Sequence, residues 1–249
     1  MNLVSGCSYT YGASWPQLLL GQHKNLGSVV AGNGYIADSI YLETNQETPE
    51  KIFVLWSGIN RLDLTLPSHV KSQEVYTTNV HGTQYIHLPN KPFPTDNYNK
   101  MKGPNWPDIT SFMEWNELPA VKKNETLTRG LFNTGHSVEQ LALETFAIDA
   151  NYHWQTQTLL SLLKIQCYAE NYKIDYRFSF IADVFDEKNK KQFGHLRKDH
   201  PLYEQIYWHN YIDLTPFEYA VKHNGLMPDN FHVELDCMQD WATEVKHLW

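Results

Sequence analysis

The sequence predicts an α/β fold with a parallel β-sheet, in a single domain spanning residues 1–249. Residues 52–56 form an uninterrupted apolar run, which is typical of a strand buried on both faces of a parallel sheet. Apolar runs alternate with helix-patterned segments over the first sixty residues, which favours βαβ units with right-handed crossovers. The last segment has apolar residues at steps of three and four, which predicts an amphipathic helix packed on the sheet.

The amino-terminal elements are assigned from their apolar spacing. We expect a strand at 3–4, a helix at 15–20, a strand at 26–30, a helix at 36–42 and a strand at 51–56. Pro16 fits the first turn of the first helix, because a missing backbone N–H costs no hydrogen bond at that position.

The region from about 64 to 135 lacks this rhythm, and we interpret it as an insertion after the third strand. Prolines interrupt it repeatedly. Within it, residues 75–80 and 83–88 flank His81-Gly82, which predicts a β-hairpin. A stretch this long exceeds an ordinary connection, so we expect a lid or cap within the single domain.

Regular spacing returns after the insertion. We expect helical structure at 138–146 and at 154–167, ending near Asn171, followed by a fourth strand at 176–181. A short helix is expected at 216–221, stopped by Asn224-Gly225. The carboxy-terminal helix is expected at 235–249, which places His232 in the loop just before it.

Charge and cysteine content count against several classes of protein. The formal net charge is −8 without a large basic cluster, so no nucleic-acid partner is expected. Three cysteines give neither a disulfide framework nor zinc-ligand spacing, which indicates a reducing compartment. No apolar run approaches the roughly 20 residues needed to cross a bilayer, and a signal peptide is not recognisable. We expect a soluble, cytoplasmic protein without a membrane partner.

Ser8 is the first candidate for chemistry. It lies in the turn Gly6-Cys7-Ser8-Tyr9-Thr10-Tyr11-Gly12, between the first expected strand and the first expected helix. A serine hydroxyl is a weak nucleophile that needs an adjacent base, and the N–H groups of a helix's first turn stabilise negative charge. The alternative interpretation is a turn or N-cap serine without chemistry.

Asp229 and His232 form a second candidate near the other end of the chain. A carboxylate three residues before an imidazole can reach its Nδ1, which fixes the tautomer and leaves Nε2 facing a serine. Residues far apart in sequence can converge at the carboxyl ends of parallel strands. The alternative interpretation is an aspartate at a helix start and a surface histidine.

The loops after the second and third expected strands offer hydrogen-bond donors. Gly32, within Ala31-Gly32-Asn33-Gly34-Tyr35-Ile36-Ala37, allows a backbone N–H to approach a reacting oxygen closely. The same segment resembles a dinucleotide-binding G-x-G-x-x-A, but it follows the second strand, and no acidic residue ends the next one. Gly58 permits a turn after which Asn60 presents a carboxamide, although Asn60 is alternatively an ordinary turn residue.

Taken in order, the patterns Gly-x-Ser, Gly-Asn, Gly-x-Asn and Asp-x-x-His resemble the four sequence blocks of the SGNH hydrolases, also called the GDSL esterase/lipase family. The resemblance covers the first sixty and the last twenty-five residues. It implies a flavodoxin-like, three-layer α/β/α fold. It also implies that Ser8 is the nucleophile, His232 the base and Asp229 the residue that orients this base. The oxyanion hole would comprise the backbone N–H of Ser8 together with Gly32 and Asn60.

Three positions bear on how this chain departs from the family pattern. Cys7 replaces the usual aspartate, which supports the turn rather than reacting, and we expect Cys7 to point away from Ser8. Arg61 replaces another aspartate and would bring a cation that favours an acidic substrate. Gly34 is an alternative to Gly32 in the second block. The chain is also similar to divergent SGNH-like proteins of tailed phages, which makes the host cytoplasm or the virion an alternative localisation.

The resemblance implies a serine esterase that hydrolyses a small ester without a cofactor or metal. O-acetyl groups on a carbohydrate are an attractive substrate, because the Trp- and Tyr-rich insertion can stack on sugar rings. One alternative is a non-catalytic binding or phage structural protein with the same fold. Another is a metal-dependent hydrolase drawing on the twelve histidines, although no H-E-x-x-H spacing occurs. The sequence leaves the oligomeric state open.

Overall fold

The fold is described from a computed structural model of the chain. The description covers residues 1–28, 31–59, 62–67, 77–80, 83–88, 150–227 and 232–248.

A four-stranded parallel sheet forms the centre of the described fold. Its strands are β1 (Asn2–Gly6), β2 (His23–Asn25), β3 (Lys51–Trp56) and β7 (Asp175–Phe180), in the order β2-β1-β3-β7. This order is that of flavodoxin-like doubly wound sheets. Beyond β7, the backbone N–H of Ile212 donates to the carbonyl of Phe178 at 2.8 Å, next to a parallel bridge between Phe178 and Tyr211. The predicted α/β class is confirmed.

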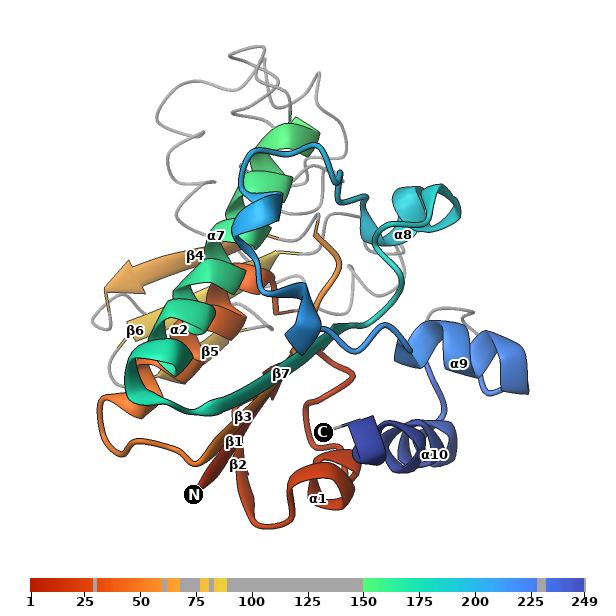
Figure 1. Ribbon diagram of the computed structural model, residues 1–249, viewed down its shortest axis with the longest axis horizontal. Helices are drawn as coiled ribbons and strands as arrows, with labels where there is room; N and C mark the ends of the chain where they lie inside the picture. The colour runs from red at the N-terminus through yellow and green to blue at the C-terminus, as the bar shows by residue number, and fades with distance from the viewer. Residues whose placement is uncertain are drawn as a thin grey trace, which may run out of the picture.

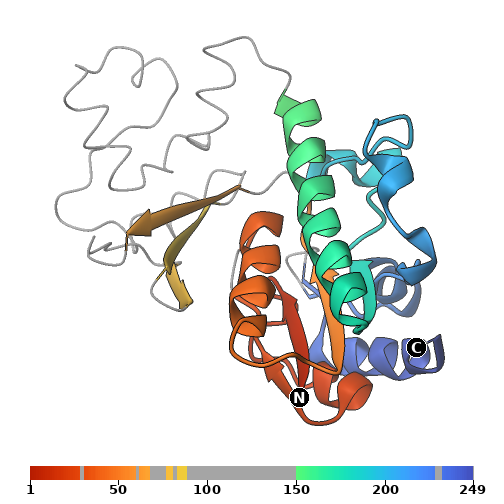
Figure 2. The ribbon, with the colours of Figure 1, turned by 60° about the vertical axis from the view of Figure 1, so that its left-hand side comes forward.

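Helices cover both faces of the sheet and complete a three-layer α/β/α arrangement (Figures 1 and 2). α2 (Asn33–Thr44) and the long α7 (Ala150–Tyr172) pack against each other on one face. α1 (Trp15–Leu20) and α10 (Leu235–Val245) pack against each other on the opposite face. α9 (Pro216–His223) lies against α10.

Short helical turns fill the connection between β7 and α9. They are η1 (Glu187–Asn189), α8 (Lys190–Phe193), η2 (Tyr203–Gln205) and η3 (Trp208–Asn210), and η4 (Lys246–Leu248) follows α10. α9 is capped at its carboxyl end by Asn224, which adopts the left-handed conformation with φ 56°. The Asn-Gly stop signal in the sequence is therefore confirmed.

A second sheet, which is antiparallel, is formed by strands that lie between β3 and β7 along the chain. It comprises β4 (Leu62–Pro67), β5 (Thr77–Val80) and β6 (Thr83–Leu88), in the order β4-β6-β5. The predicted hairpin is confirmed as the pair β5 and β6, whereas β4 was not predicted. Figure 2 shows this sheet beside α2, which β4 and β5 contact. The rest of the expected insertion, and the helix expected at 138–146, lie outside the described residues.

The second strand does not lie where the sequence predicts it. It occupies His23–Asn25 rather than 26–30, at the edge of the sheet next to β1. An edge strand tolerates polar residues, and the apolar residues that indicated a strand begin only at Leu26, after β2 has ended. Asn25 then turns the chain, because its Oδ1 accepts the N–H of Gly27 at 2.9 Å and its Nδ2 donates to the carbonyl of Thr10 at 2.7 Å.

Three aromatic rings join the amino-terminal and carboxy-terminal helices to the sheet. The ring of Trp15 on α1 lies 5.4 Å from that of Trp241 on α10, nearly perpendicular to it. Both rings also contact Phe53 on β3, at 5.7 and 6.3 Å. All three side chains are fully buried. Such edge-to-face pairs add to the free energy gained from burial, so this cluster holds the two ends of the chain together.

Replacing Trp241 with alanine is expected to lower the free energy of unfolding by about 3–5 kcal/mol, because the change leaves a large cavity between α1, α10 and β3. Urea unfolding followed by circular dichroism measures this loss. Leu160→Ala, at a leucine on α7 that is 46% exposed, serves as the control and should change stability by less than about 0.5 kcal/mol. Equal losses for the two variants would contradict the assignment.

His200 fastens the segment before η2 to α7. The backbone N–H of Leu202 donates to its Nδ1 at 3.2 Å, so the proton of the neutral ring resides on Nε2. That nitrogen lies 3.0 Å from Oγ1 of Thr156, whose hydroxyl donates to the carbonyl of Tyr152. The imidazole is buried and stacks on the ring of Tyr152. Burial lowers the pKa of His200, opposed by the nearby Asp199 carboxylate and reinforced by Arg197.

Stability is expected to fall as the pH drops below about 6.5, because the unfolded chain then binds a proton at this position that the folded chain resists. The loss is at most about 1.4 kcal/mol per pH unit for this one proton. Urea unfolding at pH 7.5 and 5.5 tests it. His200→Gln should reduce the difference, while His247→Gln, at an exposed histidine, should preserve it. An unchanged difference in His200→Gln would contradict the assignment.

Candidate active site

Ser8 lies in a tight turn at the carboxyl end of β1. The backbone N–H groups of Thr10 and Tyr11 both donate to the carbonyl of Cys7, at 2.9 and 3.0 Å. The indole Nε1–H of Trp15 donates to the carbonyl of Tyr9 at 2.8 Å, which ties the turn to the aromatic cluster. Cys7 is fully buried, whereas Ser8 is half-buried. The turn therefore leaves the serine, and not the cysteine, accessible.

His232 lies in a connection that is braced on both sides. The backbone N–H of Met227 donates to the carbonyl of His232 at 2.8 Å, and the N–H of Glu234 donates to the carbonyl of Gly225 at 2.8 Å. Gly225 is needed here, because a Cβ would lie 2.5 Å from Sγ of Cys237 on α10. This short antiparallel bridge fixes the histidine immediately before α10.

The two chain ends meet at this point. Oγ of Ser8 lies 3.4 Å from Nε2 of His232, although 224 positions separate the residues in the sequence. The distance is longer than a typical O–H···N bond, and such catalytic contacts are often loose before a substrate binds. The ring of Tyr9 flanks the imidazole, with ring centroids 5.9 Å apart. The geometry permits proton transfer from the serine hydroxyl to the imidazole.

Gly32 occupies the N-cap position of α2, at the same edge of the sheet. The turn of Ser8 and the segment leading to α2 are linked, because the N–H of Ser28 donates to the carbonyl of Gly6 at 3.0 Å and the N–H of Ala31 donates to Ser28. The side chain of Asn33 then bonds to the backbone of Ser57, which directly follows β3. The loops after β1, β2 and β3 thus meet where the strand order reverses, the usual place for ligands in such sheets.

Three of the residues predicted for the site lie outside the described residues: Asp229, Asn60 and Arg61. Their expected roles, as orienter of His232, oxyanion donor and substrate-binding cation, stay predictions. Ser8 and His232 are brought into contact, and Gly32 lies at the same edge. Sequence reasoning missed the contributions of Tyr9 and Asn33. The signal for Asn33 was its place in the Gly-Asn pattern, to which no role of its own was assigned.

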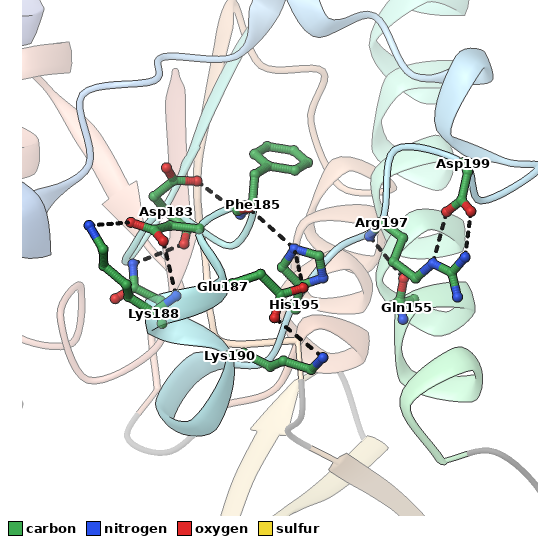
Figure 3. Close-up of polar contacts among 11 residues, drawn as sticks. Gln155, Asp183, Phe185, Glu187, Lys188, Lys190, His195, Arg197 and Asp199 are labelled. Carbon is green, nitrogen blue, oxygen red and sulfur yellow. Dashed lines mark hydrogen bonds and ion pairs between the residues drawn. The ribbon is translucent and has the colours of Figure 1, made fainter.

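The segment after β7 braces the loop that follows β3. The carbonyl of Phe193 accepts the backbone N–H of Ile59 at 2.8 Å, one residue before the expected oxyanion donor. Figure 3 shows how polar contacts hold this segment: His195 lies between the carbonyl of Phe185 (3.2 Å) and the carboxylate of Glu187 (3.5 Å). Nearby, Gln155 on α7 accepts the N–H of Arg197 at 2.9 Å. The wall of the site beside β3 is therefore anchored to α7.

The carboxylate of Glu218 on α9 also holds the segment after β7 in place. It accepts the backbone N–H of Asp183 at 2.9 Å and Nδ2 of Asn189 at 2.7 Å. Burial raises the pKa of Glu218, and these two donors act in the opposite direction. The two hydrogen bonds to this half-buried carboxylate fix the turn after β7.

Two further findings concern the part of the chain that the structure describes. Within those residues, no three His, Cys, Asp or Glu side chains are grouped so that they could hold a metal ion. No helix there is long and apolar enough to cross a membrane.

The chain matches no known protein-family model, and no curated protein sequence matches it.

Gly6→Ala is expected to displace the Ser8 turn and to lower the free energy of unfolding by about 1–3 kcal/mol. A Cβ at this position would lie 2.1 Å from Oγ1 of Thr10 and 2.9 Å from the carbonyl of Leu55. Urea unfolding of the single variants and of Gly6→Ala/Thr10→Ala forms a double-mutant cycle. The glycine change should cost less in the Thr10→Ala background, because the nearest clashing atom is then absent. Additive costs would contradict the predicted clash.

Proposed function

We propose that the protein is a serine esterase of the SGNH hydrolase type that hydrolyses a small carboxylic ester. The observation that carries the proposal is the contact between Oγ of Ser8 and Nε2 of His232 at 3.4 Å. The position of this pair at the carboxyl edge of a sheet with flavodoxin-like strand order supports the same proposal. Fold alone does not imply function, whereas a serine hydroxyl beside an imidazole supplies the nucleophile and the base that an esterase needs.

In the proposed reaction, Nε2 of His232 accepts the hydroxyl proton of Ser8 while Oγ attacks the ester carbonyl carbon. The carbonyl π electrons move to oxygen, and the backbone N–H groups of Ser8 and Gly32 stabilise the resulting oxyanion, together with Asn60. The imidazolium then donates its proton to the departing alcohol as the C–O bond breaks. Water, deprotonated by the same imidazole, hydrolyses the acyl-enzyme and restores Ser8. Asp229 is the proposed orienter of His232.

O-acetyl groups on a carbohydrate are the proposed substrate. The sequence between β6 and α7 contains Trp106 and Trp115, whose rings suit stacking on sugar faces. Arg61 follows the third block and would favour acidic sugars through its charge. The alternative from another class is a non-catalytic SGNH-fold protein that binds a ligand or serves in a phage particle, and the experiment below distinguishes the two.

A fluorophosphonate probe is expected to label the folded protein at Ser8, with peptide mass spectrometry locating the adduct. Ser8→Ala should abolish labelling. Ser8→Ala or His232→Ala should lower kcat for p-nitrophenyl acetate by about a million-fold, which leaves only the residual rate that the oxyanion hole and substrate binding provide. Ser161→Ala on α7 and His247→Ala after α10 are the matched controls. Both should leave labelling and kcat unchanged.

Acetate release from O-acetylated xylan tests the substrate class in the same preparations. Unchanged turnover in the presence of a chelator is expected, since the proposed steps use only side chains and backbone of the chain. Absence of labelling in the folded wild-type protein, judged by a cooperative melt, would overturn the esterase proposal and favour the non-catalytic alternative. Loss of activity in chelator would favour the metal-dependent alternative.

A further inference from the structure

We infer that Asn33 is a positioning residue that sets the geometry of the oxyanion hole, an inference that rests on the proposed esterase function. Asn33 directly follows Gly32, whose N–H is a proposed donor to the oxyanion. Its side chain bonds to Ser57, three residues before the other proposed donor, Asn60. One carboxamide therefore spans the two loops that must present donors to the same oxygen atom.

Both the oxygen and the nitrogen of the Asn33 carboxamide form hydrogen bonds. Its Oδ1 accepts the backbone N–H of Ser57 at 2.9 Å. Its Nδ2 donates to Oγ1 of Thr158 on α7 at 3.1 Å and lies 3.5 Å from the carbonyl of Ser57. All three residues are buried, with exposed fractions of 4% for Asn33, 0% for Ser57 and 1% for Thr158. The start of α2, the end of β3 and the middle of α7 are thereby fixed to one another.

Stability alone gives no particular reason for this arrangement. A buried amide is costly to desolvate, and its hydrogen bonds return a net gain of only about 1 kcal/mol each. What the amide adds is direction: donor and acceptor ends restrict how the loops after β2 and β3 lie relative to each other. In a hole that must place donors about 2.7–3.1 Å from a developing oxyanion, a displacement of about 1 Å costs roughly 100-fold in rate.

The same helix provides a matched comparison. Oγ of Ser39, also on α2, lies 2.8 Å from Oγ of Ser5 on β1, and both residues are fully buried. This pair joins α2 to the sheet as the Asn33 bonds do, but it lies six residues further along the helix. Ser39→Ala therefore removes a buried bond between α2 and the sheet without touching either loop of the proposed oxyanion hole.

The test compares Asn33→Ala, Thr158→Val and Ser39→Ala with the wild-type chain, using kcat and KM for p-nitrophenyl acetate, the rate of fluorophosphonate labelling, and thermal melts. Asn33→Ala should lower kcat about 10- to 100-fold, with KM changed by less than about threefold, because the oxyanion exists only in the transition state. Labelling should slow in proportion. Thr158→Val, which frees only one end of the amide, should lower kcat about two- to fivefold. Ser39→Ala should keep kcat within about twofold despite a lower melting temperature.

Two results would overturn the inference while leaving the esterase proposal intact. One is a loss of kcat in Asn33→Ala no larger than that of Ser39→Ala at a matched loss of melting temperature. The other is an effect confined to KM. If Asn33→Ala does not fold, an unchanged kcat in Thr158→Val overturns the inference instead. Inactivity of the wild-type protein toward both probe and ester overturns the proposed function, and the inference with it.

Discussion

Packing of α10 against α1 is the constraint on which the candidate site depends. Trp15 and Trp241 meet edge to face over Phe53, and this contact holds the first and last helices on one face of the sheet. A second contact reinforces it, because Nε2 of Gln239 on α10 donates to Oγ of Ser14 at the start of α1 at 2.8 Å. Ser8 precedes α1 and His232 precedes α10, so the helix pair sets the distance between them.

The parallel sheet contributes the other half of the geometry. Because all of its strands run in one direction, the loops after β1 and β3 emerge at the same edge, side by side. Hydrogen bonds from Ser28 to Gly6 and from Ser57 to Asn33 then connect the ends of β1 and β3 through the segment that follows β2. On the far side of β3, the bond from Ile59 to Phe193 adds the segment after β7. Loops that are joined by hydrogen bonds in this way hold preorganised donors in place better than mobile loops would.

Sequence reasoning succeeded where the physical signal is local. The apolar run of β3 and the proline-led start of α1 gave the bounds of both elements, and the Asn-Gly pair gave the end of α9. It failed for β2, a polar edge strand, and for β4, where Leu62, Leu64 and Leu66 alternate with other residues at the border of the stretch that was interpreted as an irregular insertion. Ser8 and His232 were predicted because loops at strand ends carry chemistry, whereas Asn33 was missed because its partners lie 24 and 125 positions away.

The most direct test of the central claim is a crystal structure of the protein after reaction with a small fluorophosphonate. The account predicts continuous density from Oγ of Ser8 to phosphorus, Nε2 of His232 beside that oxygen, and a phosphoryl oxygen within about 3.1 Å of the N–H of Gly32. An adduct on another residue, or a Ser8 adduct with His232 turned away and the phosphoryl oxygen in solvent, would contradict it.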